Sequence, residues 1–339
     1  MMKRRTTSRR RFIGIFAAAS GIAMTPLTPR HALASPMTLT APQAVSWRGI
    51  ALGADAELHI HHTDPETAQR LIDKSVAEVH RLESIFSLYQ EDSALSVLNR
   101  QGYLENPPAD MLRLLSESQY FGRLTGGAFD PTVQPLWRAY ADHFSAPDAD
   151  PDGPDSRVIA RAMALVDYAA IDVSPERIQL LRPGMALTLN GIAQGYITDK
   201  IVQQLRAAGL DRALVDMGEI HGLNTQRQSA PWRVGLADPL IPGNIVQTVE
   251  INNQALATSA GNGTTLDASG RHTHIFDPKT GRSQSRYRSV TVMAAHATQA
   301  DALSTAFSTM SLEAIRPIVE TARAKVWVTS NDGAVTVLG

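Results

Sequence analysis

Residues 189–200, with the sequence LNGIAQGYITDK, place two glycines around the point where a helical pattern begins. Backbone N–H groups at a helix N-terminus attract anions, and small residues let a diphosphate approach closely. On this interpretation Asn190, Gly191, Ala193 and Gly195 contact a ligand. The alternative is that the glycines only permit a tight turn before the helix. The pattern is neither a P-loop nor a Rossmann dinucleotide-binding fingerprint.

The segments on both sides of this turn predict a mixture of strands and helices. We expect a hairpin over residues 177–189, a helix over 191–209 and a strand over 212–220. Further strands are predicted over 45–62, 232–237, 245–251, 255–260, 289–295, 324–330 and 334–339, and helices over 65–89, 108–126 and 298–310. Because the order is not a regular βαβ alternation, the fold class is α+β, with two intimately joined lobes of mixed sheets with helices. Residues 145–156, rich in Pro and Asp, predict an insertion loop.

The N-terminal segment, residues 1–34, has the features of a Tat-type signal peptide. Arg9 and Arg10 precede an apolar run, and a small-residue cleavage site follows at residues 32–34. This segment holds seven of the 32 basic residues and no acidic residue, so the remainder has 25 basic and 33 acidic side chains, a net charge of about −8. Such a charge disfavours nucleic acid as a partner.

We therefore expect an exported, periplasmic protein, with no stable membrane insertion after signal cleavage. The chain contains no cysteine, which excludes disulfides, a lipobox cysteine and thiolate metal sites.

Two polar residues stand four apart on a predicted helix. Asp301 and Thr305 project from one face of residues 298–310, and a carboxylate beside a hydroxyl suits Mg²⁺, which takes few protein ligands when phosphates supply others. The alternative is a solvated aspartate and a threonine bonded to its own helix.

Two further segments carry candidate site residues. In GGAFDPTVQPL, residues 126–136, Asp130 precedes Pro131, where it either contacts a ligand or caps a helix. In RHTHIFDPKTG, residues 271–281, His272 and His274 alternate onto one face of a predicted strand. Neither this pair nor His59 and His61 has an adjacent third ligand, so a zinc site is a weak interpretation.

Seven stretches, taken in order, resemble one family. They are FSLYQEDSALSVLN, TGGAFDPTVQPLW, LNGIAQGYITDKI, ALVDMGEIHGLN, LATSAGN, HTHIFDPKTG and SVTVMAAHATQADALSTAFSTM. From about residue 50 to the C-terminus, the chain resembles the ApbE family of FAD:protein FMN transferases. The resemblance implies an ApbE-like, T-fold-related domain over residues 35–339. It also implies transfer of the FMN moiety of FAD to a Thr or Ser hydroxyl of an acceptor flavoprotein, with release of AMP.

The resemblance also implies roles for individual residues. The Mg²⁺ ligands would be the carbonyl of Ala193 and the side chains of Asp301 and Thr305. His274 would be the base that takes the proton of the acceptor hydroxyl. The FAD contacts would be Tyr89, Ala128, Phe129, Asp130, Gly191, Gln194 and Phe276.

The sequence departs from the family pattern at several positions. Asn190 and Gln194 stand where charged residues are common, Ser304 replaces an acidic residue, and Leu52 stands where Met is common. These departures leave two alternatives open, an FAD pyrophosphatase that forms FMN and AMP, or a non-catalytic exported FAD carrier or maturation factor. The exported location would restrict the acceptor to flavoproteins such as respiratory electron-transfer subunits.

Overall fold

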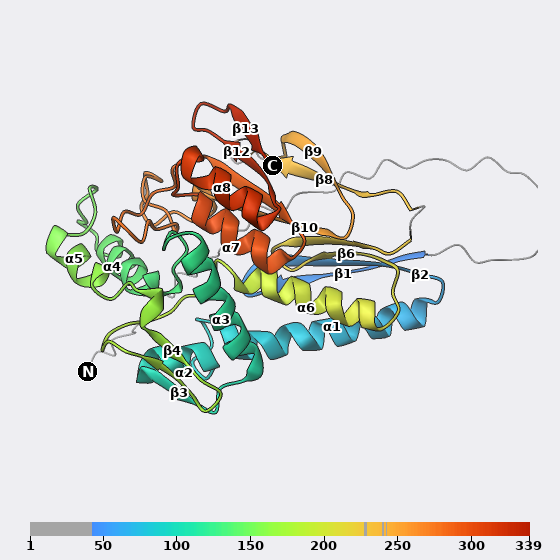
Figure 1. The fold of residues 1–339 in the computed structure, drawn as a ribbon, viewed down its shortest axis with the longest axis horizontal. Helices are drawn as coiled ribbons and strands as arrows, with labels where there is room; N and C mark the ends of the chain where they lie inside the picture. Colours follow the sequence, from blue (N-terminus) through green and yellow to red (C-terminus); the bar gives the residue numbers. More distant parts are fainter. Residues whose placement is uncertain (1–42, 227–228, 239–240, 242) are drawn as a thin grey trace, which may run out of the picture.

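A single large antiparallel sheet organises the fold. The computed structural model describes residues 43–226, 229–238, 241 and 243–339, so the predicted signal segment lies outside the described residues. The sheet has eight strands in the order β1-β2-β6-β7-β10-β11-β12-β13 (Figure 1). Their bounds are β1 Gln43–Ala51, β2 Ala54–His62, β6 Arg212–Asp216, β7 Ile220–Asn224, β10 Gln254–Ala260, β11 Ser289–Ala294, β12 Lys325–Thr329 and β13 Val335–Leu338. Every neighbouring pair is antiparallel.

Helices cover one face of this sheet. Figure 1 shows α1 (Pro65–Phe86), α6 (Ala193–Ala207) and α7 (Ala297–Phe307) lying along it, with α8 (Leu312–Ala322) beyond α7. Strand residues alternate between the two faces, so Ala213 and Val215 of β6 join the helix-covered core while Leu214 points the other way. The hairpin of β8 (Trp232–Ala237) and β9 (Ile245–Ile251) covers that second face, where Val234 and Ile251 pack against Leu214.

A smaller lobe is inserted between β2 and β6. It contains α2 (Ala94–Gln101), α3 (Ala109–Leu124), α4 (Gln134–Phe144) and α5 (Ser156–Met163), with a small sheet of β3 (Tyr103–Glu105), β5 (Arg177–Leu180) and β4 (Ile171–Val173). Residues of α3 and β5 share one continuous hydrophobic core with α1, α6 and α7. The α+β class with two closely joined lobes is therefore confirmed.

Several local predictions are confirmed and two are wrong. Residues 43–62 form the β1–β2 hairpin, residues 325–338 form the β12–β13 hairpin, and residues 146–155 are a loop. The predicted hairpin over 177–189 does not form, because β5 pairs with β3 and β4 instead of with the residues that follow it. The predicted strand at His272 and His274 is also absent, since two isolated bridges, Thr265–Thr273 and Phe276–Ser283, are the only β pairing around it in the described residues.

Sequence patterns did not predict every helix. α2, α5 and α8 were not expected, and α8 contains Pro317 within its span. No helix in the described part of the chain combines the length and apolar character needed to cross a bilayer.

Candidate functional site

The turn before α6 lies open to solvent while the helix behind it is buried. Asn190 is exposed and Gly191 and Gln194 are half-buried, whereas Ala193 is buried as the first residue of α6. The Ala193 N–H donates to Leu189 O at 2.8 Å, and the Gly195 N–H donates to Asp301 Oδ2 at 3.0 Å. The first turn of α6 thus uses two of its amides inside the protein, which leaves fewer of them for an anion.

Asp301 and Thr305 lie against this same turn. A Cβ on Gly191 would lie 2.8 Å from Thr305 Oγ1, and a Cβ on Gly195 would lie 2.3 Å from the carbonyl oxygen of Ala297. The two glycines are therefore required for close approach of α6 and α7, rather than for an unusual backbone angle. The structure brings Gly191, Ala193, Asp301 and Thr305 together.

Asp301 is a fully buried carboxylate with a raised pKa. Burial, together with the charge of Asp199, raises the pKa of Asp301 to about 7, despite the hydrogen bond from Gly195. The Ser259 hydroxyl joins the group, 2.8 Å from Ser304 Oγ and 3.5 Å from Thr305 Oγ1. Carboxylate, hydroxyl and carbonyl oxygens are the donors that Mg²⁺ prefers, so the residues present fit this ion.

No group of three or more His, Cys, Asp or Glu side chains that could hold a metal occurs in the described residues. The predicted Mg²⁺ set is different in kind, because it contains one carboxylate, one hydroxyl and one carbonyl.

Asp130 organises the loop between α3 and α4. Its Oδ1 accepts from the Thr132 N–H at 2.8 Å and from the Thr132 hydroxyl at 2.5 Å, and its Oδ2 accepts from the Tyr168 N–H at 3.0 Å. These bonds make Asp130 the N-cap of the short 3₁₀ helix Pro131–Val133, one of the two roles that the sequence left open. The Thr188 N–H donates to Pro131 O, which ties this loop to the segment before the glycine turn.

His274 and His272 differ in their contacts. The ring Nδ1 of His274 lies 3.1 Å from Thr264 O, so the Nδ1–H donates and Nε2 keeps its lone pair. Burial lowers the pKa of His274, which keeps the ring neutral near pH 7. His272 instead packs against the rings of Tyr140 and Phe144, with Nε2 3.2 Å from Pro151 O.

The remaining predicted FAD contacts differ in exposure and in the cluster they pack in. Tyr89 is 62% exposed in the loop after α1. Ala128 and Phe129 are buried in the main core, and Phe276 packs edge-on against Tyr140 in a separate cluster with Leu136 and Ala162. Tyr89 is thus available to a ligand, whereas both phenylalanines have packing roles.

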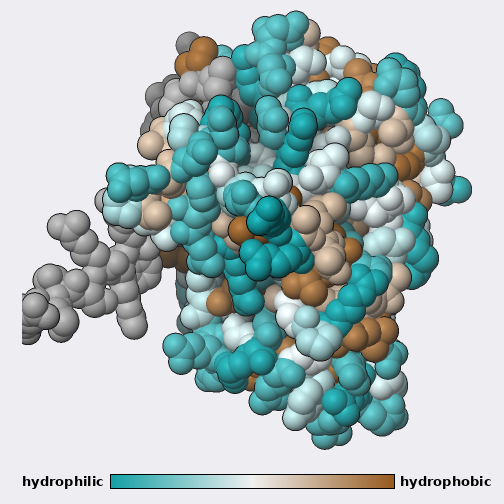
Figure 2. Space-filling view, turned by 90° about the vertical axis from the view of Figure 1, so that its left-hand side faces the viewer, coloured by the Kyte–Doolittle hydropathy of each residue, from teal (hydrophilic) through white to brown (hydrophobic). Residues whose placement is uncertain are grey.

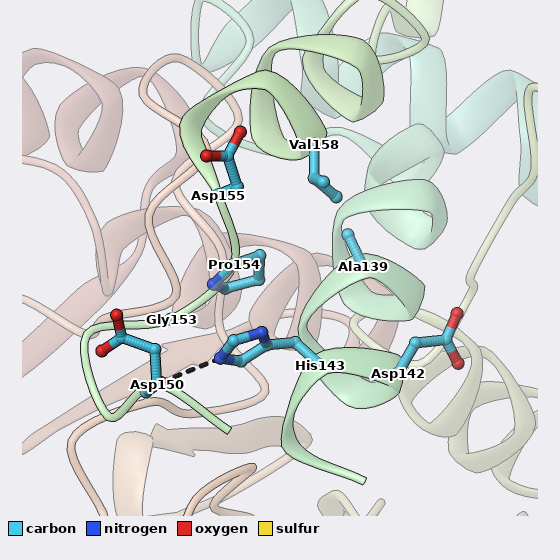
Figure 3. Close-up of a pocket in the computed structure, with 8 residues that line it drawn as sticks. All are labelled: Ala139, Asp142, His143, Asp150, Gly153, Pro154, Asp155 and Val158. Carbon is cyan, nitrogen blue, oxygen red and sulfur yellow. Dashed lines mark hydrogen bonds between the residues drawn. The ribbon is translucent and has the colours of Figure 1, made fainter. Parts of the chain in front are cut away.

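A pocket of about 520 Å³ opens between α4 and the loop before α5 (Figure 3). In that view the His143 ring points from α4 to the Asp150 carbonyl, a contact of 2.8 Å, while the Asp142 side chain points away from it. The pocket is lined by Ala139, Asp142, His143, Asp150, Gly153, Pro154, Asp155 and Val158. It includes none of the predicted site residues. The helices α4 and α5 lie at the left end of the molecule in Figure 1, the side that faces the viewer in Figure 2, where hydrophilic residues are mixed with apolar ones.

Three polar residues near the predicted metal ligands were not identified from the sequence, and two of them, His221 and Glu219, are buried. Asp199 accepts from the Ala297 and Thr298 N–H groups at 2.8 and 2.9 Å, so a residue of α6 caps α7. Burial alone would raise the pKa of Asp199, but its contacts with His221 and the α7 amides lower it. The His221 Nδ1 lies 3.7 Å from Asp199 Oδ1. Glu219 is the third residue. The feature of the sequence that could have identified it is an acidic residue directly after Gly218, where the chain turns tightly.

Comparisons with known proteins agree with this geometry. The profile of the ApbE family matches residues 52–328. A relative from Treponema pallidum, named FAD:protein FMN transferase, is 32% identical over 275 residues, which span 71% of this chain and 74% of the relative. The crystal structure of the ApbE protein from Thermotoga maritima has a TM-score of 0.76 at 26% identity, covering 87% of this chain and 97% of that one.

A second solved structure is similar over almost its whole length. The flavin transferase ApbE from Vibrio cholerae has a TM-score of 0.73 at 25% identity, covering 88% of this chain and 98% of that chain. Because the family profile spans most of the sequence and the relatives carry a transferase name, this chain is a member of the ApbE family of flavin transferases.

Proposed function

We propose that this protein transfers the FMN moiety of FAD to a Thr or Ser hydroxyl of an exported acceptor flavoprotein and releases AMP, in a reaction that requires Mg²⁺. The support comes from the names of the relatives and from the oxygen donors around Thr305 and Asp301, two residues that also touch the glycine turn. FAD is the substrate, and its diphosphate would lie at Gly191 and Gln194. Tyr89 and the loop of Ala128, Phe129 and Asp130 would lie along the flavin side, with Phe276 beyond them.

His274 is the proposed general base, and its hydrogen bond carries the chemical argument. Because Nδ1–H donates to Thr264 O, the free lone pair is on Nε2. This nitrogen would accept the proton of the acceptor hydroxyl while the hydroxyl oxygen forms a bond to the FMN phosphorus. The bond from that phosphorus to the bridging oxygen of the diphosphate breaks, and AMP leaves with the electron pair.

The metal ligands proposed are Ala193 through its carbonyl, Asp301 and Thr305. When bound, Mg²⁺ would neutralise the diphosphate and stabilise charge on the leaving AMP. Asp301 already lies 3.0 Å from the Gly195 N–H, so its carboxylate is held in one orientation before any ion arrives.

The proposed location is the periplasm, reached through the Tat-type signal over residues 1–34. The Thr or Ser flavinylation site of the acceptor would then face the same side of the membrane, as it would in a respiratory electron-transfer subunit. The domain proposed for this activity is residues 35–339.

One experiment separates this function from its alternatives. The purified protein is incubated with FAD, Mg²⁺ and an acceptor domain, and the products are analysed by mass spectrometry and by in-gel flavin fluorescence. Covalent flavin on the acceptor with free AMP supports the transferase. Free FMN and AMP without modified acceptor would indicate a pyrophosphatase, and intact bound FAD would indicate a carrier. The same reaction with EDTA tests the metal requirement.

A further inference from the structure

Helix α2 is hydrogen-bonded both to the loop that carries Tyr89 and to the segment that leads into the glycine turn. The helix itself is held in place, because Leu95 and Leu98 are buried in the main hydrophobic core. Its polar side chains bond to backbone groups outside the helix. These bonds give a physical role to the serines and the asparagine of FSLYQEDSALSVLN, residues 86–99.

The N-terminal end of α2 holds the loop of Tyr89. The Ser93 hydroxyl donates to Ser87 O at 2.6 Å, and the Ser96 hydroxyl donates to the same oxygen at 3.3 Å. The Ser87 Oγ in turn accepts from the Tyr89 N–H at 3.1 Å. Ser87 and Ser93 are buried, whereas Tyr89 is 62% exposed. The backbone of this loop is therefore fixed from the interior while Tyr89 stays accessible to a ligand.

The C-terminal half of α2 holds the segment before the glycine turn. Asn99 accepts from the Leu187 N–H at 2.6 Å through Oδ1 and donates to Leu187 O at 2.8 Å through Nδ2. The side-chain amide thus pairs with both backbone groups of one residue, as a neighbouring antiparallel strand would. Leu187 is buried, and the next N–H, that of Thr188, donates to Pro131 O at 2.8 Å. The backbone that leads to Gly191 is therefore fixed on two sides.

One helix consequently links two elements that the proposed function assigns to FAD. Ser96 and Asn99 stand three apart, so they share a face of α2. A ligand that reaches from Gly191 to Tyr89 loses affinity when either contact is displaced, because it can no longer satisfy both in one low-energy conformation. The residues of α2 need not touch FAD to have this effect.

We propose that α2 sets the distance between Tyr89 and the glycine turn, with Ser93 and Asn99 as positioning residues for FAD. The inference rests on the proposed function, which places the diphosphate at Gly191 and Tyr89 along the flavin side. Loss of either side-chain bond leaves every proposed FAD contact in the chain and displaces one contact relative to the other.

The test measures two quantities on purified protein: FAD binding in the presence of Mg²⁺, followed by flavin fluorescence, and the thermal midpoint without FAD. Asn99→Ala removes the pairing with Leu187 and keeps a good helix former in α2. The control is Asn253→Gly between β9 and β10, because the Asn253 side chain pairs in the same way with the N–H and C=O of Asn224. Glycine is used there because Asn253 has a φ of 52°.

A second pair of variants alters the other end of α2. Ser93→Ala removes the bond to Ser87 O, and its control is Ser118→Ala, since the equally buried Ser118 hydroxyl donates at 2.8 Å to a carbonyl of its own helix, α3. Tyr89→Ala, alone and together with Ser93→Ala, completes a double-mutant cycle. Ser96→Ala keeps the N-cap of α2 and removes a bond to the same carbonyl, so it replaces Ser93→Ala if that variant does not fold.

We expect Asn99→Ala and Ser93→Ala each to weaken FAD binding roughly tenfold. The two controls should lower the thermal midpoint and bind FAD as the unaltered protein does. Ser93→Ala should add nothing to the loss that Tyr89→Ala causes, because a displaced Tyr89 and an absent one deprive FAD of the same contact. Normal FAD binding by Asn99→Ala or by Ser93→Ala, or additive losses in the cycle, overturns the inference.

Failure of the proposed function gives different results. An unaltered protein that does not bind FAD, or a Tyr89→Ala protein that binds it normally, refutes the placement of the substrate and the inference with it. FAD binding that follows the expected pattern, without covalent flavin transfer to an acceptor, refutes the transferase function and upholds the role of α2.

Discussion

At the scale of single residues, His274 and His272 stand two apart in the sequence and meet different partners. The sequence placed both on one face of a strand, yet the His274 ring bonds Thr264 O and the His272 ring packs on Phe144. The two rings therefore have different surroundings, because the backbone carbonyl that each ring meets determines which of its nitrogens donates. The assignment of His274 as the base stays a prediction.

Substitution of each histidine tests that assignment. His274→Ala should retain FAD and Mg²⁺ binding and lose flavin transfer by on the order of 10²- to 10⁴-fold, the usual contribution of general-base catalysis. His272→Ala should lower the thermal midpoint through lost ring packing and leave turnover per folded molecule unchanged. Transfer rate and thermal midpoint are measured on both variants. A His274→Ala protein that is less stable but fully active would contradict the assignment.

The pH dependence of transfer gives a second test of His274. Burial lowers its pKa below the ordinary value of 6.5, so the unfolded chain binds this proton more readily than the folded protein does. The neutral ring therefore contributes stability that is lost as pH falls below 6.5. The ring also stops acting as a base when pH falls through the lowered pKa of the folded protein, because Nε2 is then protonated. We expect a pH–rate profile with an acidic limb whose midpoint lies below 6.5. A midpoint above 6.5 would assign the limb to another group.

At the scale of elements, the contact between α6 and α7 decides where Asp301 lies. Gly195 is a poor helix former, and intrinsic propensity alone predicts that alanine would stabilise α6 by roughly 1 kcal/mol. The added Cβ would instead lie 2.3 Å from Ala297 O and 2.6 Å from its carbonyl carbon. Backbone atoms cannot give way as a flexible side chain can, so packing outweighs propensity here.

Gly195→Ala is therefore expected to lower the free energy of unfolding by about 1–3 kcal/mol and to weaken Mg²⁺-dependent transfer, since the helices must separate. Chemical denaturation and the transfer assay measure the two effects. The control is Gly209→Ala, two residues after the end of the same helix, where nothing lies within 4 Å of the added Cβ and φ is 78°. It should cost roughly 1 kcal/mol of strain and leave transfer unchanged. A stabilised Gly195→Ala protein would refute the packing argument.

At the scale of the whole molecule, two lobes share one continuous core, and the proposed ligand contacts come from both. Tyr89, Asp130 and Phe276 lie in or beside the smaller lobe, while Asp301 and Thr305 belong to α7 on the large sheet. The bond from Thr188 N to Pro131 O connects the Asp130 loop to the glycine turn between the lobes.

Export concerns the whole chain and is tested with it. The export machinery recognises the twin-arginine motif of the signal peptide, and the charge-conserving double substitution Arg9→Lys with Arg10→Lys removes this motif. We expect this double variant to be absent from the periplasmic fraction, as followed by cell fractionation and immunoblotting. Arg4→Lys with Arg5→Lys, outside the pair, should be exported normally. Equal export of both variants would contradict the signal assignment.

The sequence by itself determined most of the secondary structure and the family. Long periodic segments such as Pro65–Phe86 and Ala297–Phe307 formed as helices because their apolar spacing and their burial agree. The seven ordered motifs were sufficient to place the chain in the ApbE family, because motif order persists where overall identity has fallen to 32%.

The tertiary structure determined the features that local sequence patterns could not predict. β5 pairs with β3 and β4, since the choice of strand partner depends on distant residues. Asp199 accepts from the Ala297 and Thr298 N–H groups only because α6 and α7 pack together, at sequence separations of 98 and 99 residues. The residue types predicted which chemical groups this protein has. The close approach of α6 and α7, which Gly191 and Gly195 permit, determined which of those groups lie together in one site.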